Sequence, residues 1–562
     1  MRASHIAWLL LGLSLSGLAG PPASPAAALG SQRLARSGPH RLLVLTTDGR
    51  TYLRSDRYLP PPDAPAASAR LTQREPDARL AHVSASHGPS VTSALASLRR
   101  SGAISSASYQ TYSSEYQSAQ RTLKKLHGTR YTELAAVIAN VQALAASDEF
   151  ITSRLPALFL TLQNNRRWWS TGPLLSYGQR VSFPGSRIVW ESYPGQGIEI
   201  QWLATFGEAN GYFLAGNENT AFTQLLGEII PLGTQRAGGI AWEYFFQFDG
   251  GRPPWTSGLS QGTALQALSR GWQRFKTAAY LETAKAALGI FNTRPPAGVR
   301  VPTAAGAHYL EYTYAPSELI VNGEIQAVIG LYDYTKLTGD PLGSSLFEAG
   351  DAQARLDVPH YNTGAWSMYD QHSESALNYH ELLTEFLKNL CQRTGQGPPL
   401  PAATPPPTTT TTTTPTTPVG PSGGSAPTAS SSAAHSSSTT TTTTTKPSAA
   451  ISGDEIYCST AEEFTEDLHT PPEISLLSRT LSTNSRAGVQ FSLSKVAKVS
   501  VSIRWSGKTV WSNSATVEGG KPKILWVTPK KGGTYTVSAS ATDLAGNSAS
   551  TTGTITLKGA RK

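Results

Sequence analysis

Apolar residues in the first two thirds of the chain recur at every third or fourth position, with polar residues between them. This spacing places the apolar side chains on one face of an α-helix. We therefore expect a mainly α region of amphipathic helices, and between residues 42 and 189 we expect helices wherever such a pattern is present. The clearest patterns cover residues 134–144, 155–162, 222–229, 265–275, 325–332 and 383–390.

Beyond residue 472 the apolar residues alternate with polar ones, which is the period of a β-strand with one buried face. Such runs occupy residues 489–493, 499–503 and 535–539, and D-L-A-G-N at 543–547 has the composition of a tight turn. We expect a β-sandwich over residues 472–562 that is similar to bacterial immunoglobulin-like modules. Modules of this kind are usually spacers or adhesive domains.

Two segments are expected to lie outside the folded regions. Residues 1–28 have the pattern of a signal peptide, with Arg2, a short apolar run and small residues suited to cleavage. Pro, Thr and Ser dominate residues 396–450, which we expect to form a disordered linker because they could not build a core. We therefore expect a secreted protein, extracellular or associated with the cell wall, with no membrane span.

The chain contains two cysteines, Cys391 and Cys458. Disulfides persist in the oxidising environment that an exported chain enters. Cys391 ends the last predicted helix, whereas Cys458 lies in residues 451–471, a segment that fits neither hydrophobic pattern. Our hypothesis is that a disulfide between them holds this segment against the helical domain and closes the linker into a loop.

The net charge of +9 is concentrated in the last domain. Residues 472–562 contain 13 Lys and Arg but only 3 acidic residues, whereas the rest of the chain is close to neutral. A basic exported module suits a cell-wall glycan or other acidic polysaccharide, although a solubilising surface is an equal alternative. The chain has no nucleic-acid recognition motif, zinc signature, P-loop or G-x-G-x-x-G, so we expect no nucleic-acid partner, metal or cofactor.

The most informative motifs lie between residues 316 and 383. They read P-S-E-L-I-V-N-G-E-I-Q-A-V-I-G-L-Y from Pro316, Y-N-T-G-A-W-S-M-Y-D-Q-H from Tyr361 and N-Y-H-E-L-L from Asn378. In order and spacing these motifs resemble the C-terminal domain of D-glucuronyl 5-epimerases. The resemblance implies an α/α toroid, which we place at residues 42–395. It also implies inversion of carbon 5 of glucuronate residues within an acidic polysaccharide.

Inversion at carbon 5 requires one group that removes a proton and another that returns a proton to the opposite face. The resemblance implies that Tyr369 and Tyr379 are this proton-transfer pair and that Tyr312 assists them or positions the sugar. It also implies that Glu311 and Asn322 are neighbours of the substrate. Any one of these tyrosines could instead be a packing residue with a bonded hydroxyl group, because the chain contains 21 tyrosines.

One residue of the epimerase pattern is missing. The epimerases have Y-D-L-R-H around the first catalytic tyrosine, whereas here Asp370, Gln371 and His372 follow Tyr369. The expected clamp for the substrate carboxylate is therefore absent. Either His372 or a cleft arginine such as Arg252 replaces it, or the chain acts on a different acidic sugar, or the activity is lost.

Three further residues are candidates for substrate binding. His380 could tune the neighbouring phenol or donate a proton, but a structural helix histidine is an equal interpretation. Tyr193 and Trp255 lie in loop-like segments that also resemble the epimerases, and they could form an aromatic platform for the sugar or only cap helices.

The G-L-S-Q-G sequence at residues 258–262 matches the pattern of a hydrolase nucleophile elbow. An elbow requires a strand before the serine, whereas here two prolines and a tryptophan precede it and a helical pattern begins at once. We therefore reject this interpretation and expect Ser260 in the first turns of a helix.

Three other functions remain open. A polysaccharide lyase begins with the same proton abstraction and then expels the group at carbon 4. A hydrolase would need a pair of carboxylates, for which Glu311, Asp370 and Glu381 are candidates. A glycan-binding protein would keep the cleft without turnover, and the missing arginine and the basic last domain favour this alternative.

Overall fold

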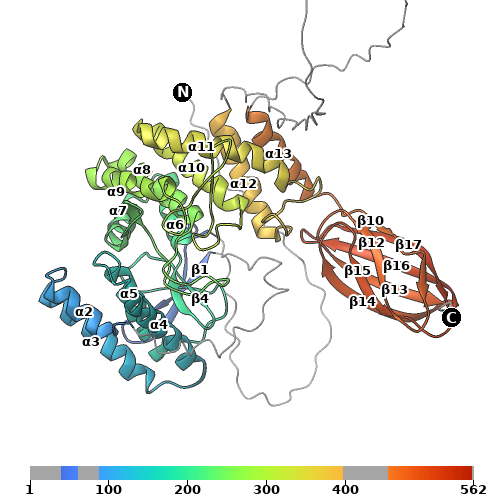
Figure 1. Ribbon diagram of the computed structural model, residues 1–562, viewed down its shortest axis with the longest axis horizontal. Coiled ribbons are helices and arrows are strands. Elements are labelled where there is room, and N and C mark those ends of the chain that lie inside the picture. Colours follow the sequence, from blue (N-terminus) through green and yellow to red (C-terminus); the bar gives the residue numbers. More distant parts are fainter. Residues whose placement is uncertain (1–39, 61–87, 396–452, 560–562) are drawn as a thin grey trace, which may run out of the picture. The chain divides into compact units, whose positions relative to one another are not determined.

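The computed structural model describes residues 40–60, 88–395 and 453–559 (Figure 1). The expected signal peptide, residues 1–28, and the expected linker, residues 396–450, lie outside these ranges. The described chain is rich in helices up to residue 394 and rich in strands from residue 474 onward. None of the helices in these ranges combines the length and the apolar character needed to cross a bilayer.

All six helical patterns correspond to helices, and most of the apolar residues that define them are buried. The order of hydrophobic and polar positions thus predicts these elements correctly. The six are α4 (Gly128–Ala146), α5 (Leu155–Thr171), α7 (Asn219–Ile229), α8 (Gly258–Phe275), α10 (Val321–Thr338) and α12 (Leu377–Thr394). The other helices of this region are α2 (Val91–Arg100), α3 (Ser106–Leu123), α6 (Trp202–Ala215), α9 (Ala278–Asn292) and α11 (Pro341–Asp357), with short 3-10 turns η2 (Ile230–Leu232) and η3 (Val358–Tyr361).

Alternate helices pack against one another in a row. Helix α6 contacts α8, α8 contacts α10, and α10 contacts α12. The closest approach is between α8 and α10, where a Cβ atom on Gly262 would lie 2.7 Å from the Ala327 Cα and one on Gly330 would lie 2.2 Å from the Gly262 carbonyl oxygen. Glycine is therefore required for these two backbones to touch. Closure of this row into a toroid stays a prediction.

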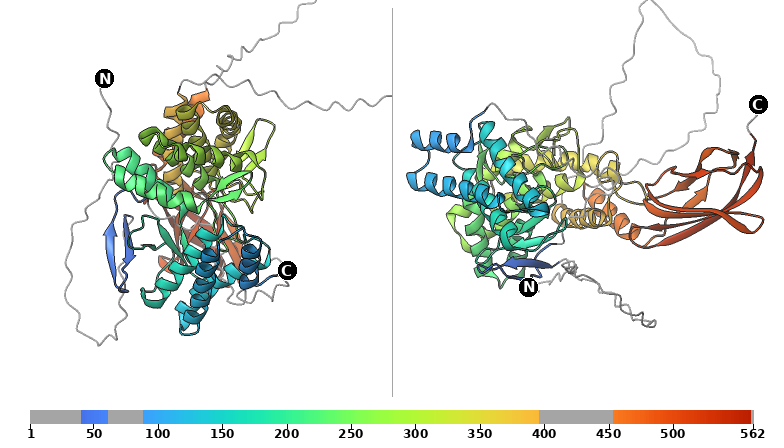
Figure 2. Two further views of the ribbon diagram at one scale, coloured as in Figure 1. Left: turned by 90° about the vertical axis from the view of Figure 1, so that its left-hand side faces the viewer. Right: turned by 90° about the horizontal axis from the view of Figure 1, so that it is seen from below.

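A five-stranded sheet accompanies the helices, with the strand order β2-β1-β3-β4-β5. Between residues 42 and 189 we expect helices only where a helical pattern is present, and the sequence analysis does not identify the strands β1, β2 and β3 of this region. In β1, residues 42–45 are all buried, so the strand lacks the alternation that would reveal it in the sequence. The strands are β1 (Arg41–Leu45) and β2 (Thr51–Ser55), both blue in Figure 2, with β3 (Arg180–Ser182), β4 (Trp190–Tyr193) and β5 (Gly197–Ile200).

Two short hairpins complete the helical region. One pairs β6 (Thr234–Arg236) with β7 (Gly239–Ala241), and the other pairs β8 (Arg300–Pro302) with β9 (Ala307–Tyr309). The first hairpin leads into the segment of residues 242–257, and the second leads into residues 310–320. Both of these segments contribute to the site described below.

Residues 474–558 form two sheets, one with the order β10-β12-β15 and the other with the order β11-β17-β16-β13-β14. Apolar side chains of both sheets build one hydrophobic core. The three alternating patterns are confirmed as β12, β13 and β16, whereas the immunoglobulin-like type of this region stays a prediction. The strands are β10 (Ile474–Leu476), β11 (Thr480–Ser482), β12 (Arg486–Leu493), β13 (Ala497–Trp505), β14 (Lys508–Val517), β15 (Lys523–Val527), β16 (Gly533–Asp543) and β17 (Ser548–Lys558).

The segment after the expected linker folds back onto the helical region. It forms α13 (Gly453–Asp467), which lies beside α12 (Figure 1). The predicted disulfide is confirmed: Cys391 on α12 is bonded to Cys458 on α13, with a Cα–Cα distance of 5.0 Å. The buried face of α13 includes Tyr457 and Phe464, which have no exposed surface. This helix is therefore part of the helical core although the residues of the expected linker separate it from α12 in sequence.

We predict that Cys391→Ser and Cys458→Ser each lower the free energy of unfolding by about 2–4 kcal/mol, because the bond restricts the unfolded chain. The two cysteines are 67 positions apart, so the restricted loop is long. Urea unfolding at pH 7 measures the effect. A reducing agent should lower the free energy of unfolding of the wild type to that of the double variant Cys391→Ser/Cys458→Ser. It should leave the double variant unchanged. Wild-type stability in either single variant would show that the bond does not hold α13.

Candidate active site

One pocket gathers most of the residues that the motifs predict. Seven of the ten predicted site residues line it: Tyr193, Trp255, Glu311, Tyr312, Asn322, Tyr369 and Tyr379. The motifs therefore converge in space, although the roles of these residues stay predictions. The other lining residues are ones that the motifs did not single out: Tyr177, Gln201, Leu203, Tyr244, Phe246, Phe248, Ser257, Leu259 and Ile320.

Tyr369 and Tyr379 lie next to each other in this pocket. Their ring centroids are 4.8 Å apart, and the ring planes meet at 48°. Tyr379 lies in the first turn of α12. Tyr369 lies in the loop before this helix, where its N–H group donates a 2.8 Å hydrogen bond to the carbonyl of Ser373. A helix and the loop that leads into it thus bring the two phenols together.

The loop that carries Tyr369 is held by the two residues that follow it. Asp370 Oδ1 accepts hydrogen bonds from two backbone N–H groups of the loop, each at 2.7 Å. The Gln371 side chain donates a 2.9 Å hydrogen bond to the carbonyl of Ser317 and accepts a 3.0 Å hydrogen bond from the N–H group of Leu319. Asp370 therefore orients a loop, and it does not line the pocket.

Glu311 and Tyr312 reach the pocket from the segment that follows β9. Ser257, the N-cap residue of α8, donates a hydrogen bond to Glu311 Oε1 at 3.0 Å. Burial raises the pKa of Tyr312 well above its usual value, and negative charge on Tyr369 or Glu311 would raise it further. Tyr312 is therefore a neutral phenol, which can donate a hydrogen bond to a ligand.

Aromatic rings form one side of the pocket. Trp255 stacks on Tyr244 with ring centroids 4.3 Å apart, and Tyr193 packs on Phe246 with centroids 4.5 Å apart. The indole N–H of Trp255 donates a 2.8 Å hydrogen bond to the carbonyl of Phe246. Aromatic rings with bonded polar groups offer flat apolar faces at fixed positions. The aromatic run W-E-Y-F-F-Q-F at residues 242–248 is the sequence signal that could have revealed this surface.

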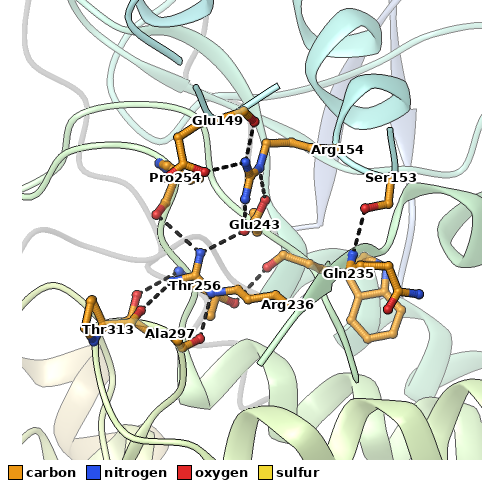
Figure 3. A network of polar contacts seen from close by, with 12 residues as sticks. Glu149, Ser153, Arg154, Gln235, Arg236, Glu243, Pro254, Thr256, Ala297 and Thr313 are labelled. Carbon is orange, nitrogen blue, oxygen red and sulfur yellow. Dashed lines mark hydrogen bonds and ion pairs between the residues drawn. The ribbon is translucent and has the colours of Figure 1, made fainter. Parts of the chain in front are cut away.

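A buried carboxylate holds the aromatic segment in place (Figure 3). Arg154 donates to both oxygens of Glu243, at 2.6 and 3.0 Å, and Arg236 donates to Oε1 at 2.8 Å. The Glu243 side chain has no exposed surface. Two guanidinium groups offset the cost of removing its charge from water. Because Arg236 also reaches the Pro254 carbonyl at 3.4 Å, the network ties both ends of residues 243–254 to α5 and to the β6–β7 hairpin.

Asn322 brings an unsatisfied polar atom to the pocket. Its Nδ2 donates to the carbonyl of Tyr379 at 3.2 Å. Its Oδ1 is buried and has no hydrogen-bond partner within the described part of the chain. A buried polar atom without a partner costs free energy, which a hydroxyl group of a ligand could recover. Among the lining residues, Asn322 therefore gives the most direct indication of a bound molecule.

Three predicted residues do not line the pocket. His372 and Arg252 are exposed. His380 is fully buried, stacks on Trp366 with ring centroids 3.7 Å apart, and its Nε2 lies 2.9 Å from the carbonyl oxygen of Phe464 on α13. None of the residues that line the pocket is Arg, Lys or His. Neither candidate replacement for the missing arginine is therefore among the residues of the pocket.

Ser260 lies in the first turn of α8, as the sequence predicts. Its N–H group donates to the Ser257 side chain at 3.3 Å, and its hydroxyl group donates to the Ser257 carbonyl at 3.1 Å. Because Ser260 belongs to a helix and does not line the pocket, the nucleophile-elbow interpretation is correctly rejected.

The pocket is narrow. Its volume is ≈ 60 Å³. More than half of the residues that line it are aromatic.

Comparisons with known proteins support the resemblance in the motifs. Residues 237–398 match the family described as D-glucuronyl C5-epimerase C-terminus. A D-glucuronyl C5-epimerase of Caenorhabditis elegans is 30% identical over 131 residues, which are 21% of this chain and 21% of that protein. An uncharacterized protein of Methanocaldococcus jannaschii is 25% identical over 138 residues, which are 23% of this chain and 45% of that protein. The chain therefore spans less than half the length of these relatives.

Among solved structures, an endo-beta-1,4-glucanase of Acetobacter xylinum matches 30% of this chain and 50% of its own, with 14% identity and a TM-score of 0.23. The family match and the curated relative, and not this structural likeness, confirm the resemblance to the epimerase C-terminal domain.

We predict that Glu243→Gln destabilises the protein by about 3–5 kcal/mol, because it leaves the mostly buried Arg236 without its carboxylate and Arg154 with Glu149 alone. Thermal and urea unfolding measure the effect. The matched control is Glu149→Gln, which removes the other carboxylate of Arg154, at 2.7 Å, from a side chain that is 43% exposed. The control should change stability by less than about 1 kcal/mol. Equal effects of the two substitutions would contradict the central position of Glu243.

We predict that His380 makes stability depend on pH. Burial lowers the pKa of His380 to about 4, from about 6.5 in the unfolded chain. The unfolded state therefore binds more protons between these values, so the contribution of His380 is complete above pH 6.5 and is lost as the pH falls through 4. The size of this contribution is about 3 kcal/mol.

His380→Gln should remove this dependence. Urea unfolding at pH 7 and pH 4 gives the difference in free energy of unfolding between wild type and variant, which should be large at pH 7 and small at pH 4. His360→Gln, at an exposed histidine, is the control. A difference for His380→Gln that is the same at both pH values would contradict a buried neutral imidazole.

Proposed function

We propose, on the premise that residues 237–398 belong to the D-glucuronyl C5-epimerase C-terminus family, that this protein is a carbohydrate epimerase acting on glucuronate-type residues of an acidic polysaccharide. The observation that carries the proposal is the pair of Tyr369 and Tyr379, whose ring centroids are 4.8 Å apart in the pocket. Tyr312 and Asn322 line the same pocket and supply polar groups beside the pair.

In the proposed reaction, one tyrosine of the pair acts as a tyrosinate and removes the proton from carbon 5. The electron pair left on carbon 5 is delocalised into the adjacent carboxyl group. The hydroxyl group of the other tyrosine then delivers its proton to the opposite face of carbon 5. One proton leaves and one enters, so the polymer keeps its composition while the configuration changes.

The carboxyl group of the substrate would be held by neutral donors, because no basic residue lines the pocket. The phenol of Tyr312 stays protonated through burial, and the Asn322 amide lies beside Tyr379. Hydrogen bonds in a pocket with little water stabilise developing charge more strongly than they would in water. They are weaker than an arginine clamp, so we expect a slow enzyme.

We also propose that the helical region is an α/α toroid and that the protein is secreted. The row formed by α6, α8, α10 and α12 supports the toroid. The disulfide between Cys391 and Cys458 supports secretion, because such bonds persist in oxidising compartments. The basic module of residues 472–562, of the immunoglobulin-like type, would keep the enzyme close to an acidic cell-wall glycan.

A glycan-binding protein without turnover is the second candidate. The observation that favours it is the absence of Arg, Lys and His from the residues that line the pocket. In that case the aromatic rings and the Asn322 amide would bind the sugar, and no proton would be exchanged.

Hydrogen exchange at carbon 5 tests the proposal. The purified chain is incubated with a panel of uronate polymers in deuterated water, and the carbon-5 hydrogen is followed by NMR. We predict that deuterium enters carbon 5 while the chains stay intact. Tyr369→Phe and Tyr379→Phe should each lower the exchange rate by about 100-fold or more, because each removes one acid–base group.

The matched control is Tyr280→Phe, a tyrosine on α9 that is outside the pocket and is as buried as Tyr369, at 7% exposure. It should leave the exchange rate unchanged. Exchange accompanied by chain cleavage and an unsaturated uronate would identify a lyase instead. No exchange, with glycan binding that Tyr369→Phe and Tyr379→Phe leave unchanged, would establish the second candidate.

A further inference from the structure

Three ionisable side chains meet beside the segments that line the pocket. His308 lies on β9, Glu324 lies in the first turn of α10, and Asp357 ends α11. His308 Nδ1 is 3.1 Å from Asp357 Oδ2 and 3.2 Å from Glu324 Oε2. One nitrogen and two carboxylate oxygens therefore converge on one point from three different elements, all within 4.8 Å of one another.

Hydrogen bonds do not satisfy this cluster. Glu324 has no exposed surface, and His308 is 1% exposed. The contact of His308 Nδ1 with Asp357 has hydrogen-bond geometry, whereas the contact with Glu324 is only an ion-pair distance. Neither oxygen of Glu324 has a hydrogen-bond partner among the described residues. A single Nδ1 proton cannot point at both carboxylates, so one buried carboxylate is left unsatisfied at a considerable cost.

With both carboxylates ionised, the cluster also carries more negative than positive charge in the absence of a further cation. Even a protonated His308 offsets only one of the two carboxylates. A divalent cation would balance both carboxylates while the imidazole stays neutral, and all three ligand atoms could point at it at once. Buried charges in proteins are usually paired or coordinate metals.

The two distances from His308 Nδ1 agree with metal coordination. Neighbouring ligand atoms bound at about 2.0–2.2 Å from one ion, in octahedral or tetrahedral geometry, lie roughly 2.8–3.6 Å from one another. The two contacts of His308 Nδ1, at 3.1 and 3.2 Å, fall in this interval. A charge-assisted hydrogen bond to a carboxylate would be shorter, at about 2.7–2.9 Å.

A neighbouring side chain orients one of the carboxylates. Gln353 Nε2 donates to the second oxygen of Asp357 at 2.8 Å, and Gln353 Oε1 accepts from Thr303 at 2.6 Å. Such outer contacts are typical of residues that bind metals. The Asp357 side chain is 17% exposed, which gives an ion and its water molecules a path to the cluster.

We propose that His308, Glu324 and Asp357 bind a divalent metal ion of the zinc or manganese class, with water in the remaining positions. Calcium and magnesium prefer oxygen ligands alone, whereas an imidazole combined with carboxylates suits transition metals. The three ligands are too far apart in the sequence to form a recognisable signature, so the sequence alone does not predict this site.

The ion would have a structural role. It would join β9, α10 and α11 to one another. Glu311 lies three residues after His308, and Asn322 lies two residues before Glu324, so the ion would fix the two segments that bring these residues to the pocket. It would not itself touch the substrate.

Metal content and thermal stability test this proposal without reference to activity. The full chain is prepared without a histidine tag, stripped with a chelator, mixed with Zn²⁺ or Mn²⁺ and passed through gel filtration in metal-free buffer. We expect about one equivalent of at least one of the two ions to be retained and the melting temperature to rise. His308→Gln and Asp357→Asn should each weaken affinity by about tenfold or more.

The control is His360→Gln, which removes an exposed histidine three residues after Asp357 and should bind metal like the wild type. If His308→Gln does not fold, as judged by circular dichroism, the metal retention of Asp357→Asn, at the partly exposed ligand, tests the proposal. Retention of less than about a tenth of an equivalent of both ions by the wild type would overturn the proposal. Wild-type retention by folded Asp357→Asn would overturn it equally.

Discussion

The buried carboxylate of Glu243 is the constraint on which the pocket depends. Its bonds to Arg154 and Arg236 are 2.6 to 3.0 Å long, and no part of its side chain reaches solvent. An uncompensated charge at this depth would be costly, so the two arginines and the glutamate must fold together or not at all. The position of residues 243–254 follows from this requirement, because the same network fixes both of their ends, Glu243 and Pro254 (Figure 3).

A second constraint acts on the other side of the pocket. The residue next to Tyr379, His380, faces away from the pocket and bonds α13, which is covalently attached to the same helix through Cys391 and Cys458. The first turn of α12 therefore has a catalytic candidate on one face and a buried anchor on a neighbouring face. A segment that follows the expected linker thus supports a residue that precedes it, and the helical domain is complete only when α13 is in place.

Much of this arrangement could be predicted from the sequence, because it depends on local periodicity and on motifs. The apolar face of α10 and the pairing of Cys391 with Cys458 are examples. The strand β1 could not be predicted, since its residues are buried on both faces and show no alternation. The role of Glu243 could not be predicted either, because its two partners lie 89 and 7 residues away in the sequence. The sequence is equally consistent with His380 in the site and with His380 in the core. Only its contacts with Trp366 and α13 place it in the core.

Inversion of carbon 5 of a polymer-linked uronate by the paired tyrosines can be tested through the ratio of the two carbon-5 epimers in the polymer. This ratio is measured after prolonged incubation, starting separately from a glucuronate polymer and from its carbon-5 epimer. If the two tyrosines act as an epimerase pair, we expect both reactions to converge on one epimer ratio, with the chain length of the polymer unchanged. The opposite result is that both polymers keep their starting epimer ratio although the protein binds them. This result would contradict epimerisation by the tyrosine pair.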